Sequence, residues 1–333
     1  MKKLALILII PLLFACKEKY VRDFDPQKNF DAIWEIFDTK YCFFEEKNID
    51  WNGVKVIYEP KLKDIKNAEV GMFDFFAQMI DTLQDGHVNL YAPFDVSRCK
   101  GWFESYPENF NSDIIYSRYL KENYRISGGF QYNAVANGKI GYIRYSSFES
   151  AISATGMQYI SAFFSNSKKL IIDVRNNGGG SLGYSSSFAE CFFKEKTLTG
   201  YIRHKTGAGH SDFSDYQAVY TDPKEKLHDW SDFKVVILTN RRCYSATNEF
   251  ICRVKNAPNV TVIGGTTGGG GGIPSSSELP CGWLIRFSSV QLTDKNKKQI
   301  ECGIAPDIEV NLSETDIANG YDTMIEYAIN LLK

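Results

Sequence analysis

The sequence predicts an α/β protein whose N-terminal part is helical. Beyond Lys139, short apolar runs of strand character alternate with windows of helical periodicity, which is the pattern of an α/β sheet. Before residue 90, apolar residues recur at helical spacing instead. A hydrophobic share of 44% over 333 residues is typical of a folded globular chain and excludes a mostly disordered one.

Residues 1–16 are predicted to lie outside the fold. A charged start is followed by an apolar run from Leu4 to Phe14, which is shorter than the roughly 20 residues that span a bilayer but fits a secretory signal. The segment Leu13-Phe-Ala-Cys16 resembles a bacterial lipobox, in which the cysteine becomes the lipidated N-terminus. We therefore expect an exported bacterial lipoprotein of the cell envelope, held on the periplasmic or surface face of a membrane through Cys16. A plain signal peptide is the alternative.

Residues 20–91 are expected to form a helical subdomain. Apolar side chains fall at helical spacing in 30–41 and in 70–84, and Asp85-Gly86 then provides a helix stop. The next 47 residues, 92–138, are rich in aromatic side chains and have no clear period, so we interpret them as a connecting segment.

Residues 139–333 contain the alternating elements. Strands are predicted at 140–145, 170–174, 199–203, 234–238 and 260–263, and helices at 153–165, 184–194, 246–256 and 314–332. The polar segment 205–230 interrupts this order, and a loop of that length is often a lid or a binding loop.

Overall charge and composition exclude several classes of partner. The chain has 38 basic and 40 acidic residues, so no excess positive charge favours a nucleic acid. The eight cysteines form no C-x-x-C pair, which argues against a zinc ribbon or a thioredoxin-type motif. His204 and His210 flank a glycine-containing loop with acidic neighbours, but no compact ligand motif supports a metal there. We expect no bound metal.

A triple glycine follows the strand at 170–174. Gly178-x-Gly180-x-x-Gly183 matches the dinucleotide fingerprint, yet Asp173 and Arg175 charge the end of this strand, and no acidic residue closes the next strand to hold a ribose. We therefore expect no nucleotide. Adjacent glycines can also expose backbone N–H groups to an anion, as an oxyanion hole does.

Ser245 stands where the helix at 246–256 should begin. A serine there either caps the helix or acts as a nucleophile at its N-terminus. The surrounding residues are not Gly-x-Ser-x-Gly, which argues against an α/β-hydrolase. The glycine run at 264–272 lacks the Gly-Lys-Ser/Thr ending of a phosphate loop. His87, at the end of a predicted helix, can interact with the helix dipole or take part in chemistry.

Five motifs, in order, together resemble the S41 peptidases, the family of C-terminal processing proteases and tricorn-type proteases. They are the helical segment from Phe30 to Trp51, Asp85-Gly-His87, Asp173-Val-Arg-Asn-Asn-Gly-Gly-Gly180, Tyr244-Ser-Ala246 and Gly303-Ile-Ala-Pro-Asp307. The resemblance implies a crotonase/ClpP-like core over 139–333 and a nucleophilic role for Ser245.

The sequence departs from part of that family. Processing proteases of the Ser–Lys type carry a lysine in a Thr-x-Gly-Lys-Gly run, but here residues 267–272 are a threonine followed by five glycines. The tricorn-type branch instead uses a histidine and a glutamate, and His87 and Glu301 stand at the matching positions. Residues 92–138 are too short for a PDZ domain, so the core itself would have to recognise the substrate.

The resemblance therefore implies an exported serine endopeptidase of the carboxyl-terminal-processing type that acts on polypeptides without a cofactor. Ser245 would attack the carbonyl, His87 would act as the base, and Glu301 would orient His87 or stabilise its protonated form. Backbone N–H groups of Ala246 and of Gly179 or Gly180 would hold the oxyanion. The alternative is a catalytically inactive module of the same fold that binds an extended peptide or an apolar ligand.

Overall fold

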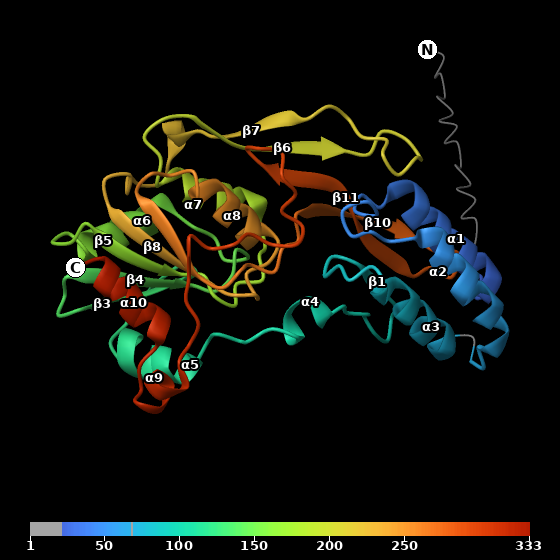
Figure 1. Ribbon diagram of the computed structural model, residues 1–333, viewed down its shortest axis with the longest axis horizontal. Helices are drawn as coiled ribbons and strands as arrows, with labels where there is room; N and C mark the ends of the chain where they lie inside the picture. Colours follow the sequence, from blue (N-terminus) through green and yellow to red (C-terminus); the bar gives the residue numbers. More distant parts are fainter. Residues whose placement is uncertain (1–21, 68) are drawn as a thin grey trace, which may run out of the picture.

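The computed structural model describes residues 22–67 and 69–333. The predicted signal segment 1–16, with Cys16, lies outside these residues. Figure 1 shows an α/β unit at one end of the molecule, the N-terminal helices at the other, and strands of a second sheet between them. Among the described residues, no helix has the length and apolar character needed to cross a bilayer.

A seven-stranded sheet forms the centre of the α/β unit. Its strand order is β12-β9-β8-β5-β4-β3-β2, parallel from β12 to β4 and antiparallel for β3 and β2. The strands are β2 (Arg125–Ser127), β3 (Phe130–Val135), β4 (Ile140–Tyr145), β5 (Lys169–Asp173), β8 (Lys234–Thr239), β9 (Val260–Gly264) and β12 (Ile308–Glu309). The predicted α/β class is confirmed.

Helices cover both faces of this sheet, as Figure 1 shows. Ile172 on β5 packs into a core with Met157 and Phe188, whereas its neighbour Ile171 packs with Ile325 on the opposite face. This alternation follows from the two-residue period of a strand, and burial of both faces explains why β5 is apolar throughout. The helices on the first face are α6 (Ala154–Phe163), α7 (Leu182–Glu190) and α8 (Ala246–Val254); those on the second include η2 (Ile115–Leu120) and α10 (Thr323–Leu331).

A five-stranded sheet joins this unit to the N-terminal helices. It contains β1 (Asn89–Tyr91), β6 (Thr197–His204), β7 (Gln217–Thr221), β10 (Gly272–Glu278) and β11 (Leu284–Asp294), with β11 paired to β1, β6 and β10. The helices against it are α1 (Pro26–Lys40), α2 (Trp51–Tyr58), η1 (Glu59–Asp64) and α3 (Val70–Asp81). Their shared core includes Phe37 and Phe76 from the helices and Ile285 and Phe287 from β11.

Two predicted boundaries need correction. The helices of the predicted subdomain 20–91 share their core with residues 279–287 at the start of and before β11, almost 200 residues later, so the subdomain also includes this later part of the chain. The predicted connecting segment 92–138 contains α4 (Gly101–Glu104) and α5 (Ser112–Ile114), and also β2 and β3. Because β3 pairs with β4 over six positions, the large sheet begins before the predicted start at residue 139.

Two smaller expectations also differ. The helix predicted over 314–332 is divided into α9 (Glu314–Ala318) and α10, because Gly320 takes a φ of 73° and Asp322 caps α10 through the Ile325 N–H. The predicted loop 205–230 contains β7, which pairs with β6, and the short helix η3 (Pro223–Glu225).

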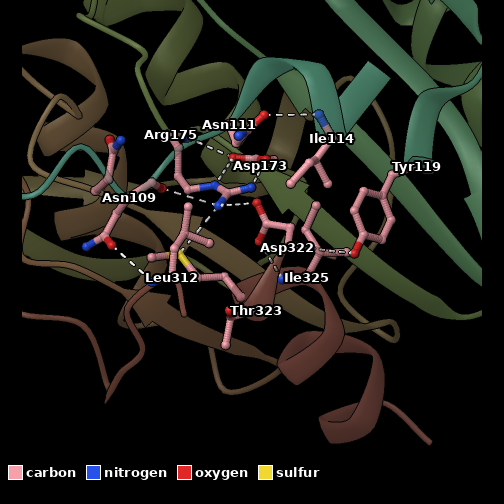
Figure 2. Close-up of polar contacts among 12 residues, drawn as sticks. Asn109, Asn111, Ile114, Tyr119, Asp173, Arg175, Leu312, Asp322, Thr323 and Ile325 are labelled. Carbon is pink, nitrogen blue, oxygen red and sulfur yellow. Dashed lines mark hydrogen bonds and ion pairs between the residues drawn. The ribbon is translucent and has the colours of Figure 1, made fainter. Parts of the chain in front are cut away.

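A buried ionic network fixes the end of β5 to the start of α10 (Figure 2). Arg175 donates to both carboxylate oxygens of Asp173, at 2.9 and 2.7 Å, and to Asp322 Oδ2 at 2.9 Å. Tyr142 donates a further hydrogen bond to Asp173 at 2.8 Å. Buried charges are tolerated when they are paired in this way. The network therefore holds the turn that begins after Asp173.

Candidate active site

His87 and Ser245, which are 158 residues apart in the chain, meet where the two sheets adjoin. His87 lies between α3 and β1, and Ser245 lies between β8 and α8. The distance between His87 Nε2 and Ser245 Oγ is 2.9 Å, which is within hydrogen-bonding reach. The two side chains that sequence reasoning paired as base and nucleophile are thus in contact.

Ser245 has a strained backbone. Its φ of 58° and ψ of −121° lie where residues with a Cβ are rare, and its side chain makes no hydrogen bond that caps α8. Its N–H donates to Gly269 O at 2.9 Å, while its hydroxyl faces His87. The helix-cap alternative is therefore wrong, and the strain itself is a feature that clusters at functional sites.

The triple glycine packs directly against Ser245. A Cβ at Gly179, whose φ is 102°, would lie 2.7 Å from Tyr244 O, 2.8 Å from Ser245 Cβ and 2.9 Å from Ala246 N. No side chain fits there. Gly179 thus permits a close approach of this turn to the Ser245 backbone.

The predicted anion donors differ in their availability. The N–H groups of Ala246, at the start of α8, and of the exposed Gly180 have no acceptor among the described residues. The N–H of Gly179, in contrast, donates to Asn177 Oδ1 at 3.0 Å. Gly179 is therefore engaged within its own turn, which corrects its assignment as a donor to the oxyanion.

His87 is in a state suited to accepting a proton. Burial lowers its pKa to about 4; the charge of Asp85 opposes this shift, whereas Arg286 and Lys47 add to it. The imidazole is consequently neutral at neutral pH. Its Nδ1 atom is buried and has no hydrogen-bond partner among the described residues.

Glu301 lies in the same buried cluster, but it makes no hydrogen bond to His87. Its Oε1 is 3.0 Å from Lys47 Nζ, and its Oε2 has no hydrogen-bond partner within the described chain. Burial and then the charge of Asp85 raise its pKa to about 8, against the opposing effect of Lys47. No hydrogen bond therefore joins Glu301 to His87 within the described chain, and the predicted role of Glu301 toward His87 stays a prediction.

Tyr244 occupies the space that a lysine in the glycine run would need. A Cβ at Gly270, whose φ is 75°, would lie 2.6 Å from the Tyr244 ring. Trp102 stacks on the same ring with centroids 4.2 Å apart. The missing lysine thus coincides with an aromatic pair packed against the nucleophile turn.

Sequence reasoning did not assign a role to Asp85, which is almost completely buried beside His87. Its Oδ1 accepts the His87 N–H at 2.7 Å. The Asp-Gly-His motif was the available signal, but an aspartate and a glycine after a helix are also an ordinary helix stop.

The remaining predicted candidates form separate contacts. His210 Nε2 lies 2.9 Å from Asp38 Oδ1, and His204 Nδ1 lies 3.3 Å from Ser214 Oγ. In residues 22–67 and 69–333, no group of three or more His, Cys, Asp or Glu side chains could hold a metal ion. All seven cysteines in these ranges are free thiols, and all but Cys302 are buried.

Comparisons with known proteins agree on one family. The model of peptidase family S41 matches residues 139–310, and that of the tricorn protease C1 domain matches residues 24–81. A CtpA-like serine protease of Staphylococcus aureus is 27% identical over 177 residues, which are 52% of this chain and 34% of that protein. The chain thus spans about a third of the length of the curated relatives it matches.

Solved structures extend the similarity to nearly the whole chain. A candidate peptidase from Parabacteroides merdae is 45% identical, covers 92% of this chain and 96% of its own, and superposes with a TM-score of 0.87. Mature CPAF is 12% identical, with a TM-score of 0.63 over 92% of this chain and 97% of its own, and shows likeness of fold. The family match spans more than half of the chain and includes the Ser245 turn, so this protein belongs to peptidase family S41, a family of serine peptidases.

Proposed function

We propose that this protein is an exported serine endopeptidase of the carboxyl-terminal-processing type that uses Ser245 as nucleophile and His87 as base. The observation that carries the proposal is the 2.9 Å contact between the strained Ser245 and a buried His87 that is neutral at neutral pH. A neutral imidazole accepts a proton, and a serine at the N-terminus of α8 lies beside free N–H groups.

The reaction would proceed by acyl transfer. Ser245 Oγ attacks the substrate carbonyl while its proton passes to His87 Nε2, and the N–H groups of Ala246 and Gly180 stabilise the oxyanion. His87 then gives this proton to the leaving amine. In the second half, a water molecule loses a proton to His87 as it attacks the acyl-enzyme, and the proton returns to Ser245 as the ester breaks.

Glu301 would contribute through its charge. It lies in the cluster that contains Lys47 and Asp85, and it is not hydrogen-bonded to His87. When Glu301 is ionised, its negative charge favours the imidazolium form of His87 that arises during the reaction.

The proposed substrate is a polypeptide bound in an extended form. The chain's formal charge of −2 offers no strong preference for charged partners, and its S41 relatives include proteins named as CtpA-like serine proteases. The lipobox at Cys16 supports export and attachment to a membrane by a lipid.

Two variants and one reactive probe test this function. Ser245→Ala and His87→Ala should each lower peptide hydrolysis on the order of 10⁴-fold or more, with little change in melting temperature. A fluorophosphonate should label wild-type Ser245, as located by mass spectrometry, and should not label Ser245→Ala. Undiminished hydrolysis by Ser245→Ala would refute the mechanism. A folded wild-type protein that neither hydrolyses peptides nor reacts with the probe would instead be the peptide-binding module.

A further inference from the structure

We propose that Asp85 is a positioning residue of this site, whose carboxylate ties the His87 backbone and the Tyr244–Ser245 turn to one point. This inference rests on the proposed function, because it concerns how the base and the nucleophile are held together. Asp85 makes no hydrogen bond to Ser245 Oγ or to the His87 ring, so it acts through its neighbours.

The carboxylate of Asp85 accepts four hydrogen bonds. Oδ1 accepts the His87 N–H at 2.7 Å and the Tyr244 hydroxyl at 3.3 Å. Oδ2 accepts the Tyr41 hydroxyl at 3.0 Å and the Ser288 hydroxyl at 3.1 Å. With a relative exposure of 1%, Asp85 is satisfied entirely by protein donors.

These donors come from several separate elements of the fold. Tyr41 is the C-cap residue of α1, Ser288 lies in β11, and Tyr244 lies in the turn between β8 and α8, directly before Ser245. His87 and Ser245 therefore depend on a junction between the two sheets for their alignment. A displacement of about 1 Å between reacting groups can cost on the order of 100-fold in rate, so a shared anchor at this junction matters.

Gly86 makes the close approach of these elements possible. A Cβ at Gly86 would lie 2.7 Å from Trp102 Nε1 and 3.0 Å from the Tyr244 ring. Tyr244 packs edge-on against His87, with ring centroids 5.0 Å apart. The Asp-Gly-His motif thus combines a carboxylate anchor, a residue without a side chain and the base.

The charge of Asp85 gives it a second effect on His87. The titratable and charged groups around this carboxylate and His87 are Tyr41, Cys42, Lys47, Cys99, Tyr244, Arg286 and Glu301. Burial opposes ionisation of Asp85, but Lys47, His87 and the hydrogen bonds lower its pKa overall. Asp85 is therefore an anion at neutral pH, and its charge raises the pKa of His87 against the effect of burial. An amide of the same shape cannot do this.

The decisive variant is Asp85→Asn, which keeps the shape and removes the charge and part of the hydrogen bonding. We expect kcat to fall on the order of 100-fold while KM changes little, and labelling of Ser245 by a fluorophosphonate to slow in parallel. The acid limb of the kcat/KM profile should also move to lower pH, because the charge that raises the His87 pKa is lost. A purely structural role would not move that limb.

Asp229→Asn is the control for the loss of a hydrogen-bonded carboxylate. Asp229 Oδ1 accepts the Ser231 N–H at 3.0 Å and the Ser231 hydroxyl at 2.6 Å, but Asp229 precedes β8, whereas Ser245 follows this strand. The variant should leave kcat per titrated serine and the acid limb unchanged. Tyr41→Phe and Tyr244→Phe, which each remove one donor, should lower kcat by roughly tenfold and keep the proposal testable if Asp85→Asn does not fold.

The inference would be overturned if folded Asp85→Asn kept the wild-type kcat per titrated serine and its kcat/KM profile showed no shift of the acid limb. If that variant does not fold, wild-type kcat in both tyrosine variants would overturn it. Hydrolysis that survives Ser245→Ala would refute the proposed function itself, and the two failures are therefore distinguishable.

Discussion

At the scale of single residues, the two buried carboxyl groups of the site, Asp85 and Glu301, have different ionisation states. Both lie near the same cation, Lys47. Asp85 accepts four hydrogen bonds, and its pKa is lowered, whereas Glu301 has a polar contact with Lys47, and burial raises its pKa to about 8. Two neighbouring carboxyl groups in low dielectric separate their titrations in this way. Glu301 thus holds a proton at neutral pH and loses it as the pH rises through about 8.

This difference predicts a pH dependence that belongs to Glu301. As Glu301 ionises, its negative charge favours the imidazolium form of His87, so kcat should rise as the pH increases through about 8. Glu301→Gln should remove this rise, and Lys47→Met should move its midpoint to higher pH because the opposing cation is gone. The measurement is kcat against pH for the three proteins; an unchanged midpoint in Glu301→Gln would contradict the assignment.

Glu301 also makes the free energy of unfolding depend on pH. The folded-state pKa of Glu301 lies above the ordinary value of 4.5, so the folded state binds this proton more tightly than the unfolded chain does. That contribution is fully present below about 4.5 and is lost as the pH rises through about 8. Between these limits, the free energy of unfolding should therefore fall more steeply in the wild type than in Glu301→Gln, as denaturant titrations at several pH values can show.

Individual residues also show where sequence reasoning reaches its limit. His87 and Ser245 could be paired because each lies in a short motif with a fixed order along the chain. The strain at Ser245 could not be predicted, since it depends on the hydrogen bond to Gly269 O from a distant loop. The sequence also could not show that the Gly179 N–H is unavailable to an oxyanion, because this N–H donates to the Asn177 side chain within the turn.

At the scale of elements, two turns form one rigid unit. Asn176, at a φ of 58°, donates its N–H to Asn240 Oδ1 at 3.0 Å, and Asn240 Nδ2 donates in return to Asn176 Oδ1 at 2.6 Å. The Tyr244 N–H then donates to Asn177 O at 3.1 Å. The turn after β5 is thereby fixed to the turn after β8, which places the glycines beside Ser245.

This packing predicts opposite outcomes for two adjacent glycines. Gly179→Ala would place a methyl group within 3 Å of Tyr244 O, Ser245 Cβ and Ala246 N at a φ of 102°, so the two turns must separate. We expect kcat to fall on the order of 100-fold or more. Gly178→Ala is the control, because a Cβ there meets no atom within 4 Å. Equal activities of the two variants would show that the turn spacing is unimportant.

Strands could be predicted from the sequence where helices cover both faces of the sheet, and could not be predicted where the strand is partly exposed. The residues of β5 and β8 form continuous apolar runs because helices cover both faces of the sheet. Short, partly exposed β2 and β3 lack such a run, and so they were not recognised within 92–138. The serine-rich β10 was hidden for the same reason, although it pairs with β11 along its whole length.

At the scale of the whole molecule, the site is a property of the junction between the two sheets. His87 precedes β1 of the five-stranded sheet, and Ser245 follows β8 of the seven-stranded sheet. Local sequence patterns describe each side, but they contain no information on how the sides meet. That is why the resemblance of ordered motifs was more informative here than the periodicity of any single segment.

The lipobox gives a prediction for the molecule in its cellular setting. Five residues separate Cys16 from Arg22, the first described residue, and these six steps along the chain span at most about 20 Å. A lipid on Cys16 would therefore hold the N-terminal helices close to a bilayer.

The wild type should fractionate with membranes and carry a lipid mass on Cys16, whereas Cys16→Ser should lose this mass and retain an uncleaved N-terminal segment. Hydrolysis of a short peptide by detergent-solubilised Cys16→Ser should equal that of the wild type, because the anchor takes no part in the chemistry. Wild-type protein that lacks any lipid at Cys16 would favour the plain signal peptide and leave the Ser245–His87 mechanism untouched.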